Sequence, residues 1–349
     1  MYREIPVSIF LVSYQQKDYI LEALNSVLSQ NYKDLEIVIA DDGSTDGTAE
    51  LIDECVRSYD GPHRIIVLPK ELNLGLVANM NRAMAACSGE VLVMCSGDDV
   101  LKPDRASMAA REFQLHPSLM AQFVNLEIID SDSKVIRSRW SKIKERIIVS
   151  HRSYSHELFA GLPFFVGAGG TYRRTLLDYF GSLPKSLESE DSALCLRALM
   201  LGDVLADPRI GVSWRWHGKN ESIGGYSNSS GKINSVVRFR KLARGYQQRY
   251  LFSQKIEKDI RLCIKDTKSN QVNLLNLNSL NIEEGLICRL KFHVTHPNAR
   301  IKGFFLSALN VLRSKDVRFT KKIRVLSKST LKVLFPKIVL YPISRFFGR

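Results

Sequence analysis

EVLVMCSGDDVLKPD, residues 90–104, is the stretch that decides the fold of this chain. The apolar run Val91–Cys95 predicts a buried strand, and it ends at once in the polar residues 96–99 (SGDD). A strand that ends in carboxylates is typical of α/β sheets, which bind ligands at the carboxyl ends of their strands. Carboxylate oxygens are also the ligands that Mg²⁺ and Mn²⁺ prefer. Taken alone, however, the stretch is explained better by a local polar turn in which Asp99 caps a neighbouring group.

A second strand upstream ends in the same way. Leu35–Ala40 runs directly into Asp41 and Asp42, some 57 positions before Asp98 and Asp99. Because the carboxyl ends of parallel strands meet at one edge of a sheet, we expect all four carboxylates to face one crevice. Four acids there would repel one another strongly without cations or hydrogen-bond donors. The repeated pattern therefore favours a functional edge over turn chemistry.

The N-terminal part of the chain alternates between strands and short helices. Apolar runs predict strands at 7–12, 35–40, 64–68 and 91–95, and helical spacing predicts helices at 18–28, 48–59 and 76–87. This alternation predicts an α/β fold with a Rossmann-like, mainly parallel central sheet flanked by helices and joined by right-handed crossovers.

The middle of the chain predicts a less regular part of the same domain. Strands are expected at 120–130, 135–140 and 210–216, a helix at 154–162 and a strand-like segment at 164–172. Residues 218–231 have the composition of a loop and contain the domain boundary. We therefore expect one domain over residues 1–225 and a mainly helical, basic C-terminal extension over residues 226–349.

Two further polar segments have ordinary structural explanations. Glu190 and Asp191 begin an apolar stripe of helical spacing, where acids are favourable and Ser189 fits the N-cap position. Arg215 lies at the end of the strand expected at 210–216, and His217 follows it, where a single histidine is more often structural than a ligand. Neither G-x-G-x-x-G nor G-x-x-x-x-G-K-[ST] occurs, so the sequence contains no glycine loop of the usual nucleotide-binding kinds.

Composition narrows the class of protein and its compartment. The six cysteines form no Cys-x-x-Cys pair, which argues against a zinc site or a disulfide framework and favours a reducing cytosol. We expect no signal peptide at the N-terminus, and no apolar run approaches the roughly 20 residues of a membrane span.

The net charge of +14 is concentrated near the C-terminus. Residues 301–349 contain twelve Lys and Arg but a single acid, Asp316. Their mixture of basic and apolar side chains suits peripheral contact with an anionic surface, such as the inner face of a cell membrane. A solvated helix face is the alternative. Nucleic acid is not an expected partner, because no nucleic-acid module is recognisable.

Together these features resemble family 2 of the glycosyltransferases, enzymes of the GT-A fold. Four segments carry the resemblance in the expected order: VSIFLVSYQQKDYILEALNSVLSQNYKDLEIVIADDGSTDGT (7–48), NLGLVANMNRAMAACSGEVLVMCSGDDVLKPD (73–104), LESEDSALCLRALMLG (187–202) and WRWHGKNES (214–222). The similarity covers about residues 5–225. Within the family, the chain looks most like bacterial enzymes that build surface polysaccharides such as O-antigen.

The resemblance implies an activity and a role for each matching position. The activity would be inverting, metal-dependent, hexosyltransferase-type transfer from a nucleotide-diphosphate sugar to a hydroxyl of a glycan or lipid-linked acceptor. Asp191 would be the general base, and Asp98 would bind Mg²⁺ or Mn²⁺ with His217 as a further ligand. The nucleotide sugar would be bound by Val12, Tyr14, Asp41, Asp42, Ser96, Gly97, Asp99, Glu190 and Arg215.

The sequence departs from the family pattern at three places, and two other interpretations stay open. Ser96 replaces the first Asp of D-x-D, residues 12–15 (VSYQ) replace the usual Pro-Thr-Tyr-Asn, and Met80 replaces a common Arg. A sugar-phosphate nucleotidyltransferase would carry a glycine-rich, basic loop after the first strand, which residues 13–17 do not supply. A non-catalytic nucleotide-sugar-binding scaffold would not require acids at positions 98 and 191.

Overall fold

The computed structural model describes residues 4–217 except 34, 71, 142–143, 150–165, 186 and 188–189, together with residues 220, 259 and 262. Its strands are β1 (Val7–Ser13), β2 (Leu35–Asp41), β3 (Arg64–Val67), β4 (Val91–Ser96), β5 (Val100–Leu101), β6 (Leu119–Ile129), β7 (Val135–Arg137), β8 (Ile147–Val149), β9 (Gly170–Arg173) and β10 (Asp203–Arg215). Its helices are α1 (Ile20–Leu28), α2 (Thr48–Arg57), α3 (Leu76–Ala86), α4 (Arg105–Leu115), α6 (Thr175–Phe180) and α7 (Glu190–Leu201), with a 3₁₀ turn, η1, at Gly167–Gly169.

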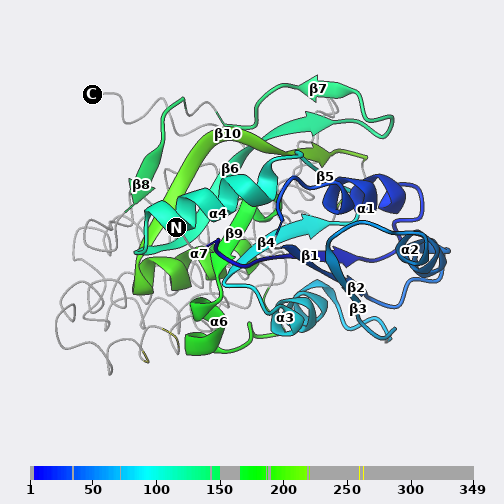
Figure 1. The fold of residues 1–349 in the computed structure, drawn as a ribbon, viewed down its shortest axis with the longest axis horizontal. Coiled ribbons are helices and arrows are strands. Elements are labelled where there is room, and N and C mark those ends of the chain that lie inside the picture. The colour runs from blue at the N-terminus through cyan, green and yellow to red at the C-terminus, as the bar shows by residue number, and fades with distance from the viewer. Residues whose placement is uncertain are drawn as a thin grey trace, which may run out of the picture. The chain divides into compact units, whose positions relative to one another are not determined.

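One mixed sheet lies at the centre, with the strand order β3-β2-β1-β4-β9-β6-β10-β5. β1 to β4 are parallel, which confirms the prediction for this half. β9 is antiparallel to both β4 and β6, so β6 and its parallel neighbour β10 run in the same direction as β4. The carboxyl ends of β1, β2, β4, β6 and β10 therefore share one edge, which points to the right in Figure 1 and is called the carboxyl edge below.

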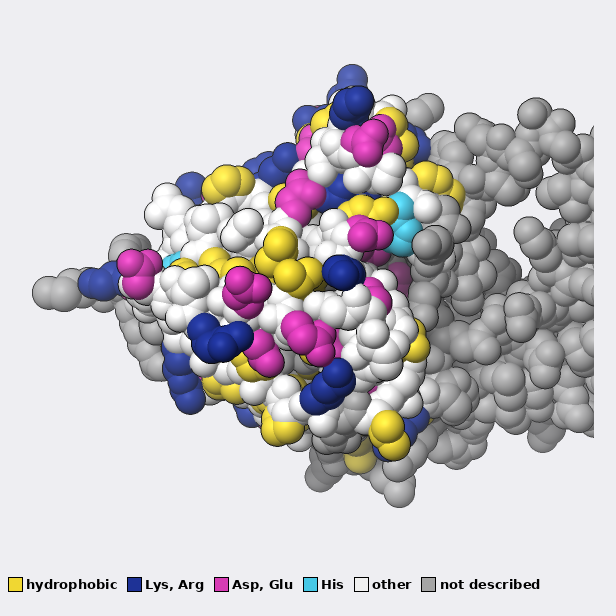
Figure 2. All heavy atoms as spheres, turned by 90° about the vertical axis from the view of Figure 1, so that its right-hand side faces the viewer, with side chains coloured by type: hydrophobic (Ala, Val, Ile, Leu, Met, Phe, Trp, Pro, Cys, Tyr) yellow, Lys and Arg dark blue, Asp and Glu magenta, His cyan; other side chains and the backbone are white. Residues whose placement is uncertain are grey.

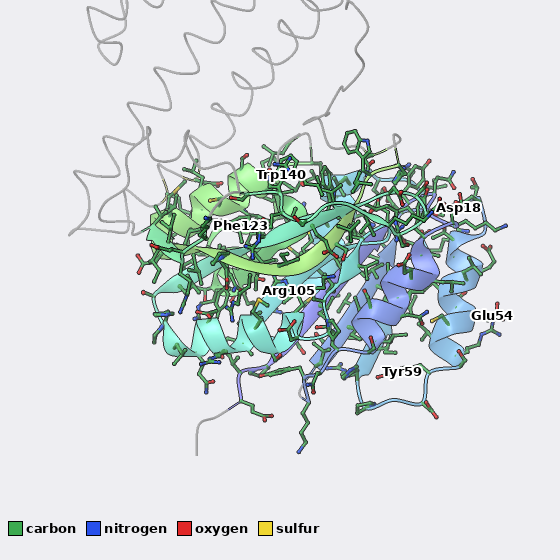
Figure 3. The ribbon with its side chains drawn as sticks, turned by 90° about the horizontal axis from the view of Figure 1, so that it is seen from above. Asp18, Glu54, Tyr59, Arg105, Phe123 and Trp140 are labelled. Atoms are coloured by element: carbon green, nitrogen blue, oxygen red, sulfur yellow. The ribbon has the colours of Figure 1, made fainter. Side chains whose placement is uncertain are left out.

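Helices cover both faces of this sheet, as predicted. Val7, Ile9 and Leu11 of β1 pack in one apolar cluster with side chains of α1 and α4. α3 packs on β1 and β2, and α7 packs on β6, β9 and β10. Figure 3 shows α1 and α4 together on one side of the strands. Alternate residues of each buried strand thus serve different helical layers, because successive side chains point to opposite faces.

The segment predicted as a strand at 164–172 is shorter and begins with a turn. Residues 167–169 form η1, and pairing starts at Gly170. A Cβ atom on Gly169 would lie 2.7 Å from the carbonyl oxygen of Val124, so the η1 backbone packs directly on β6. The return strand expected at 135–140 is confirmed in shortened form by β7, antiparallel to β6. The helix predicted at 154–162 lies outside the described residues.

Contacts along the chain divide it into two compact units, residues 1–223 and 224–349. The structure describes residues 259 and 262 of the second unit. The boundary after residue 225 and the helical, basic extension over 226–349 therefore stay predictions. Within the described part of the chain, none of the helices has the length and apolar character needed to cross a bilayer.

Glu36 of β2 ties together three segments at the amino end of the sheet. Its buried carboxylate accepts hydrogen bonds from the Ser8 hydroxyl at 2.7 Å and from the backbone N–H and hydroxyl of Ser88 at 2.6 and 2.7 Å. It also pairs with Arg64 at 3.0 Å. Burial raises the pKa of Glu36, but the bonds from Ser8 and Ser88 and the charge of Arg64 outweigh burial and leave the pKa lowered.

We predict that Glu36→Gln lowers the free energy of unfolding at pH 7 by about 2 kcal/mol, because it removes a charged acceptor. A depressed carboxyl pKa stabilises the fold above the unfolded value of about 4.3, and this stabilisation is lost as the pH falls through the folded value. The difference between wild type and variant should therefore shrink below about pH 4.3 in urea titrations. Glu54→Gln, on the exposed surface of α2 (Figure 3), is the control and should match wild type throughout. An equal difference at pH 3 and pH 7 would contradict the prediction.

Candidate active site

Asp41 and Asp42, at the end of β2, fix the loops on the β1–β2 side of the carboxyl edge. Asp41 Oδ1 accepts hydrogen bonds from the hydroxyls of Ser13 and Ser44 at 3.0 and 2.6 Å, and its Oδ2 accepts from Ser44 N–H at 2.8 Å. Asp42 accepts from the backbone N–H groups of Leu74 and Gly75, both at 2.8 Å. The two carboxylates that we predicted to bind a nucleotide therefore hold the loops that follow β1 and β2 and the turn before α3.

Val12, Tyr14 and Gly97 lie where β1 and β4 end side by side. Gly97 N–H donates to the carbonyl oxygen of Val12 at 2.9 Å. A Cβ atom on Gly97 would lie 2.3 Å from Gln16 Oε1 and 2.9 Å from Ser13 Cβ, so this position needs glycine for the close approach of the two turns. The Tyr14 side chain is exposed at this edge, whereas Val12 is buried.

Asp98 and His217 are brought together although they lie far apart in the sequence. Asp98 Oδ2 and His217 Nε2 are 3.1 Å apart, and both side chains are largely buried. The imidazole of His217 stacks on the ring of Tyr19, with 4.9 Å between ring centroids. The structure thus brings the two residues that we predicted as metal ligands into direct contact.

Arg215 is wholly buried, and its guanidinium is surrounded by protein acceptors. Nε donates to the Asp98 carbonyl oxygen at 2.8 Å, and Nη1 donates to the Asp130 carbonyl oxygen at 3.1 Å and to the Ser133 hydroxyl at 2.9 Å. Nη2 pairs with Glu22 of α1. The Tyr19 ring covers the guanidinium, with 4.8 Å between its centroid and Cζ. These contacts give Arg215 the role of holding the Asp98 loop, while its contact with a nucleotide sugar stays a prediction.

Asp99 lies beneath this loop and is buried as well. Its Oδ1 accepts the backbone N–H of Arg215 at 2.9 Å. Burial and then the charge of Asp98 raise the pKa of Asp99 well above its usual range, against the opposing effect of Arg215. Asp99 therefore connects β10 to the end of β4, and the expectation that it faces an open crevice is wrong.

The carboxyl edge differs from the predicted cluster of four open carboxylates. Asp41, Asp42 and Asp99 are buried and hydrogen-bonded to backbone N–H groups, so the repulsion expected among them is met by local donors. Figure 2 faces this side of the molecule and shows acidic side chains spread among basic and apolar ones, not gathered into a single patch.

Glu190 and Asp191 begin α7 and approach β4 through η1. A Cβ atom on Gly167 would lie 3.3 Å from Glu190 Oε1, 3.6 Å from Asp191 Cβ and 3.8 Å from Met94 Sδ. Met94 lies two residues before Ser96 on β4. Asp191 Oδ1 accepts the Ser192 N–H at 2.6 Å, as acids at helix starts do. Ser189, the expected N-cap, lies outside the described residues.

Arg105, at the start of α4, holds the glycine segment that separates these acids from β6. Its guanidinium is wholly buried between α4 and the strands (Figure 3) and donates to the Gly169 carbonyl oxygen at 3.1 Å and to the Thr171 hydroxyl. Burial lowers the pKa of Arg105 to about 10, against the opposing charge of Asp207. Sequence inspection missed Arg105, Tyr19 and Glu22, because no motif or periodicity marks them.

The donor set at Asp98 and His217 fits a divalent cation only in part. The described residues contain no group of three or more His, Cys, Asp or Glu side chains arranged to hold a metal. Mg²⁺ in nucleotide sites, however, is commonly held by one or two protein ligands together with phosphate oxygens and water. Asp98 and His217 are the described residues that would hold such an ion.

Comparison with known proteins agrees with this architecture. An uncharacterized glycosyltransferase of Nostoc sp. is 34% identical over 130 residues, 37% of this chain and 39% of that protein. Chondroitin synthase of Escherichia coli is 30% identical over 135 residues, 39% of this chain and 19% of that protein. The matches thus span about two-fifths or less of these relatives. The crystal structure of S. aureus TarS 1–349 in complex with UDP has a TM-score of 0.54 at 15% identity, covering 95% of this chain and 92% of that one.

The fold and the arrangement of the carboxyl edge define a protein of the GT-A class. Residues 8–181 match the pattern of Glycosyl transferase family 2. The chain belongs to this family, as the resemblance of its four motifs predicted.

We predict that Arg215→Met lowers the free energy of unfolding by about 3 kcal/mol, since a buried acceptor left without a donor costs about 1–3 kcal/mol. The carbonyl oxygens of Asp98 and Asp130 would both lose their donor. Arg64→Met is the matched control, because it also removes an arginine paired with a glutamate, but this arginine side chain is 67% exposed. Its cost should stay below about 1 kcal/mol in urea titrations. Equal losses for the two variants would contradict the structural role of Arg215.

Proposed function

We propose that this chain is an inverting, metal-dependent glycosyltransferase that moves a sugar from a nucleotide-diphosphate donor to an acceptor hydroxyl. The observation that carries the proposal is the placement of two acidic centres around the end of β4. Asp98 with His217 lies just beyond this strand, and the α7 acids approach it through Gly167 and Met94. A leaving group and an attacking hydroxyl need such centres on two sides of one anomeric carbon.

The donor would lie along the carboxyl edge between β1 and β4. Val12, Tyr14, Asp41 and Asp42 would line the base and ribose, and Ser96 and Gly97 would lie beside the phosphates. UDP is the first nucleotide to test, since TarS shares the fold and forms a complex with UDP. A cation held by Asp98 and His217 would stabilise the negative charge that develops on the diphosphate.

Asp191 is the residue that we propose as the general base, with Glu190 beside it. Asp191 lies in the first turn of α7, where the positive end of the helix favours an acidic side chain. It would take the proton from the acceptor hydroxyl as the oxygen attacks the anomeric carbon. A single displacement with the leaving group on the opposite side inverts the anomeric configuration.

Two substitutions should separate donor binding from chemistry. Asp98→Asn should abolish the Mn²⁺-dependent part of the thermal shift that UDP produces, because binding stabilises the fold in proportion to occupancy. Asp191→Asn should keep this shift but lower turnover about 10²–10⁴-fold, the usual contribution of a general base, or about 3–5 kcal/mol of transition-state stabilisation. Asp178→Asn replaces an exposed acid on α6 and is the control. It should leave both the thermal shift and the turnover unchanged.

The wild-type chain in the same assays distinguishes the alternatives. A sugar-phosphate nucleotidyltransferase would consume a nucleoside triphosphate and release pyrophosphate. A non-catalytic scaffold would show the thermal shift without transfer or hydrolysis of any nucleotide sugar. Near wild-type turnover of Asp191→Asn would remove Asp191 as the base.

The acceptor that we propose is a lipid-linked glycan of bacterial surface polysaccharide synthesis, such as O-antigen. The support is the basic segment 301–349, which would bring the enzyme to the inner face of the cell membrane as a peripheral protein. The structure of this segment lies outside the described residues.

We predict that replacing the twelve Lys and Arg of residues 301–349 by Gln in the full chain releases the protein from anionic liposomes in sedimentation assays. Each basic residue near such a surface contributes about 1 kcal/mol, which the replacement would remove. Transfer to a soluble acceptor should persist. Unchanged liposome binding would refute the membrane contact.

A further inference from the structure

Tyr172 of β9 has a buried hydroxyl that packing alone does not explain. The side chain is wholly buried, and its ring meets Phe123 edge-on with 5.9 Å between centroids. Its hydroxyl oxygen has no hydrogen-bond partner among the described residues. Phenylalanine would provide the same ring contacts without burying an unpaired polar atom. A buried polar group without a partner is costly and calls for an explanation.

The hydroxyl lies against the glycine segment that borders the proposed base. A Cβ atom on Gly170 would be 2.3 Å from Tyr172 Oη and 2.9 Å from the Gly167 carbonyl oxygen. The same Gly167 lies against Glu190 and Asp191, as described above. The absence of side chains at Gly167 and Gly170 therefore lets the tyrosine hydroxyl and the two carboxylates pack against the same short strip of backbone.

The charges around the hydroxyl indicate which group it serves. Burial raises the pKa of Tyr172 well above its usual range, and the charge of Asp191, followed by that of Glu190, adds to this effect. Among the residues that the structure describes, Cys195 of α7 and Arg105 of α4 also act on the hydroxyl. Burial also raises the pKa of the Cys195 thiol, so Tyr172 and Cys195 are both neutral. The Tyr172 hydroxyl therefore stays protonated and can donate a hydrogen bond to a carboxylate.

We propose that Tyr172 is a positioning residue for Asp191, whose carboxylate receives a hydrogen bond from the tyrosine hydroxyl when the nucleotide is bound. This inference rests on the proposed function. Catalytic hydrogen bonds are often long in ligand-free structures and tighten in the complex, which agrees with an unpaired hydroxyl here. The bond would orient the base and favour its ionised form.

Tyr172→Phe tests this role, because it removes the hydroxyl and keeps the ring. We expect unchanged or slightly higher thermal stability and unchanged UDP binding. We expect kcat to fall about 10-fold, since a hydrogen bond to a charged group is lost. The acidic limb of the kcat–pH profile should move up by about one pH unit. Without the hydrogen bond, the ionised form of Asp191 is stabilised about tenfold less relative to the protonated form, so the pKa of the base rises by that amount.

Tyr32→Phe is the matched control. The Tyr32 hydroxyl donates to the Ile5 carbonyl oxygen at 2.7 Å, on the opposite side of the sheet from α7. This variant should lose stability but keep the wild-type pH profile. A loss of stability in Tyr172→Phe together with an unmoved acidic limb would show a merely structural role and overturn the proposal.

A measurement without turnover separates this proposal from the proposed function. Carbon-13 NMR of the aspartate carboxyl groups, with the Asp191 signal assigned from its loss in Asp191→Asn, follows the titration of Asp191 in the free protein and with UDP and Mg²⁺. A higher pKa of Asp191 in Tyr172→Phe supports the proposal even if the wild-type chain transfers no sugar. Identical titrations in wild type and Tyr172→Phe under both conditions refute it, whatever the enzyme assay shows.

Discussion

The buried guanidinium of Arg215 is the interaction on which the carboxyl edge depends. A charge without access to water is tolerated only when it is paired and hydrogen-bonded. The partners of Arg215 come from α1, from the loop after β4 and from the turn between β6 and β7. Their positions are therefore fixed relative to one another by a single side chain. The Asp98 carboxylate faces His217 because its own backbone is held by Arg215 two residues before that histidine.

A second buried guanidinium, that of Arg105, performs a similar task on the other side of β4. It donates to the backbone of the glycine segment against which Glu190 and Asp191 lie. The two arginines thus hold the backbone beside the two groups of acids, the Asp98 loop and the glycine segment at α7. Among the acids at this edge, Asp41, Asp42 and Asp99 stabilise loops, which leaves Asp98 and the α7 acids as the candidates for chemistry.

Much of the fold followed from local pattern. The strands that end at Asp41 and Ser96 were recognisable because apolar runs stop abruptly at polar residues, and their parallel pairing followed from the intervening helices. The insertion of β9 between β4 and β6 could not be foreseen, because its register depends on contacts between segments distant in sequence. The repulsion expected among the carboxylates is relieved by hydrogen-bond donors such as the Leu74 N–H, which donates to Asp42. No sequence motif reveals these donors.

The sequence by itself determined the α/β class, the strand ends that carry acids and, through its motifs, the residue types of the candidate site. The tertiary structure decided which of these residues share a place and what each can do. It buried Arg215 as a support for the Asp98 loop, and it placed the Tyr172 hydroxyl against the glycine segment that borders the acids of α7. The physical reason is that periodicity reports which face of an element is buried, whereas hydrogen bonding and desolvation depend on the neighbours that folding brings together.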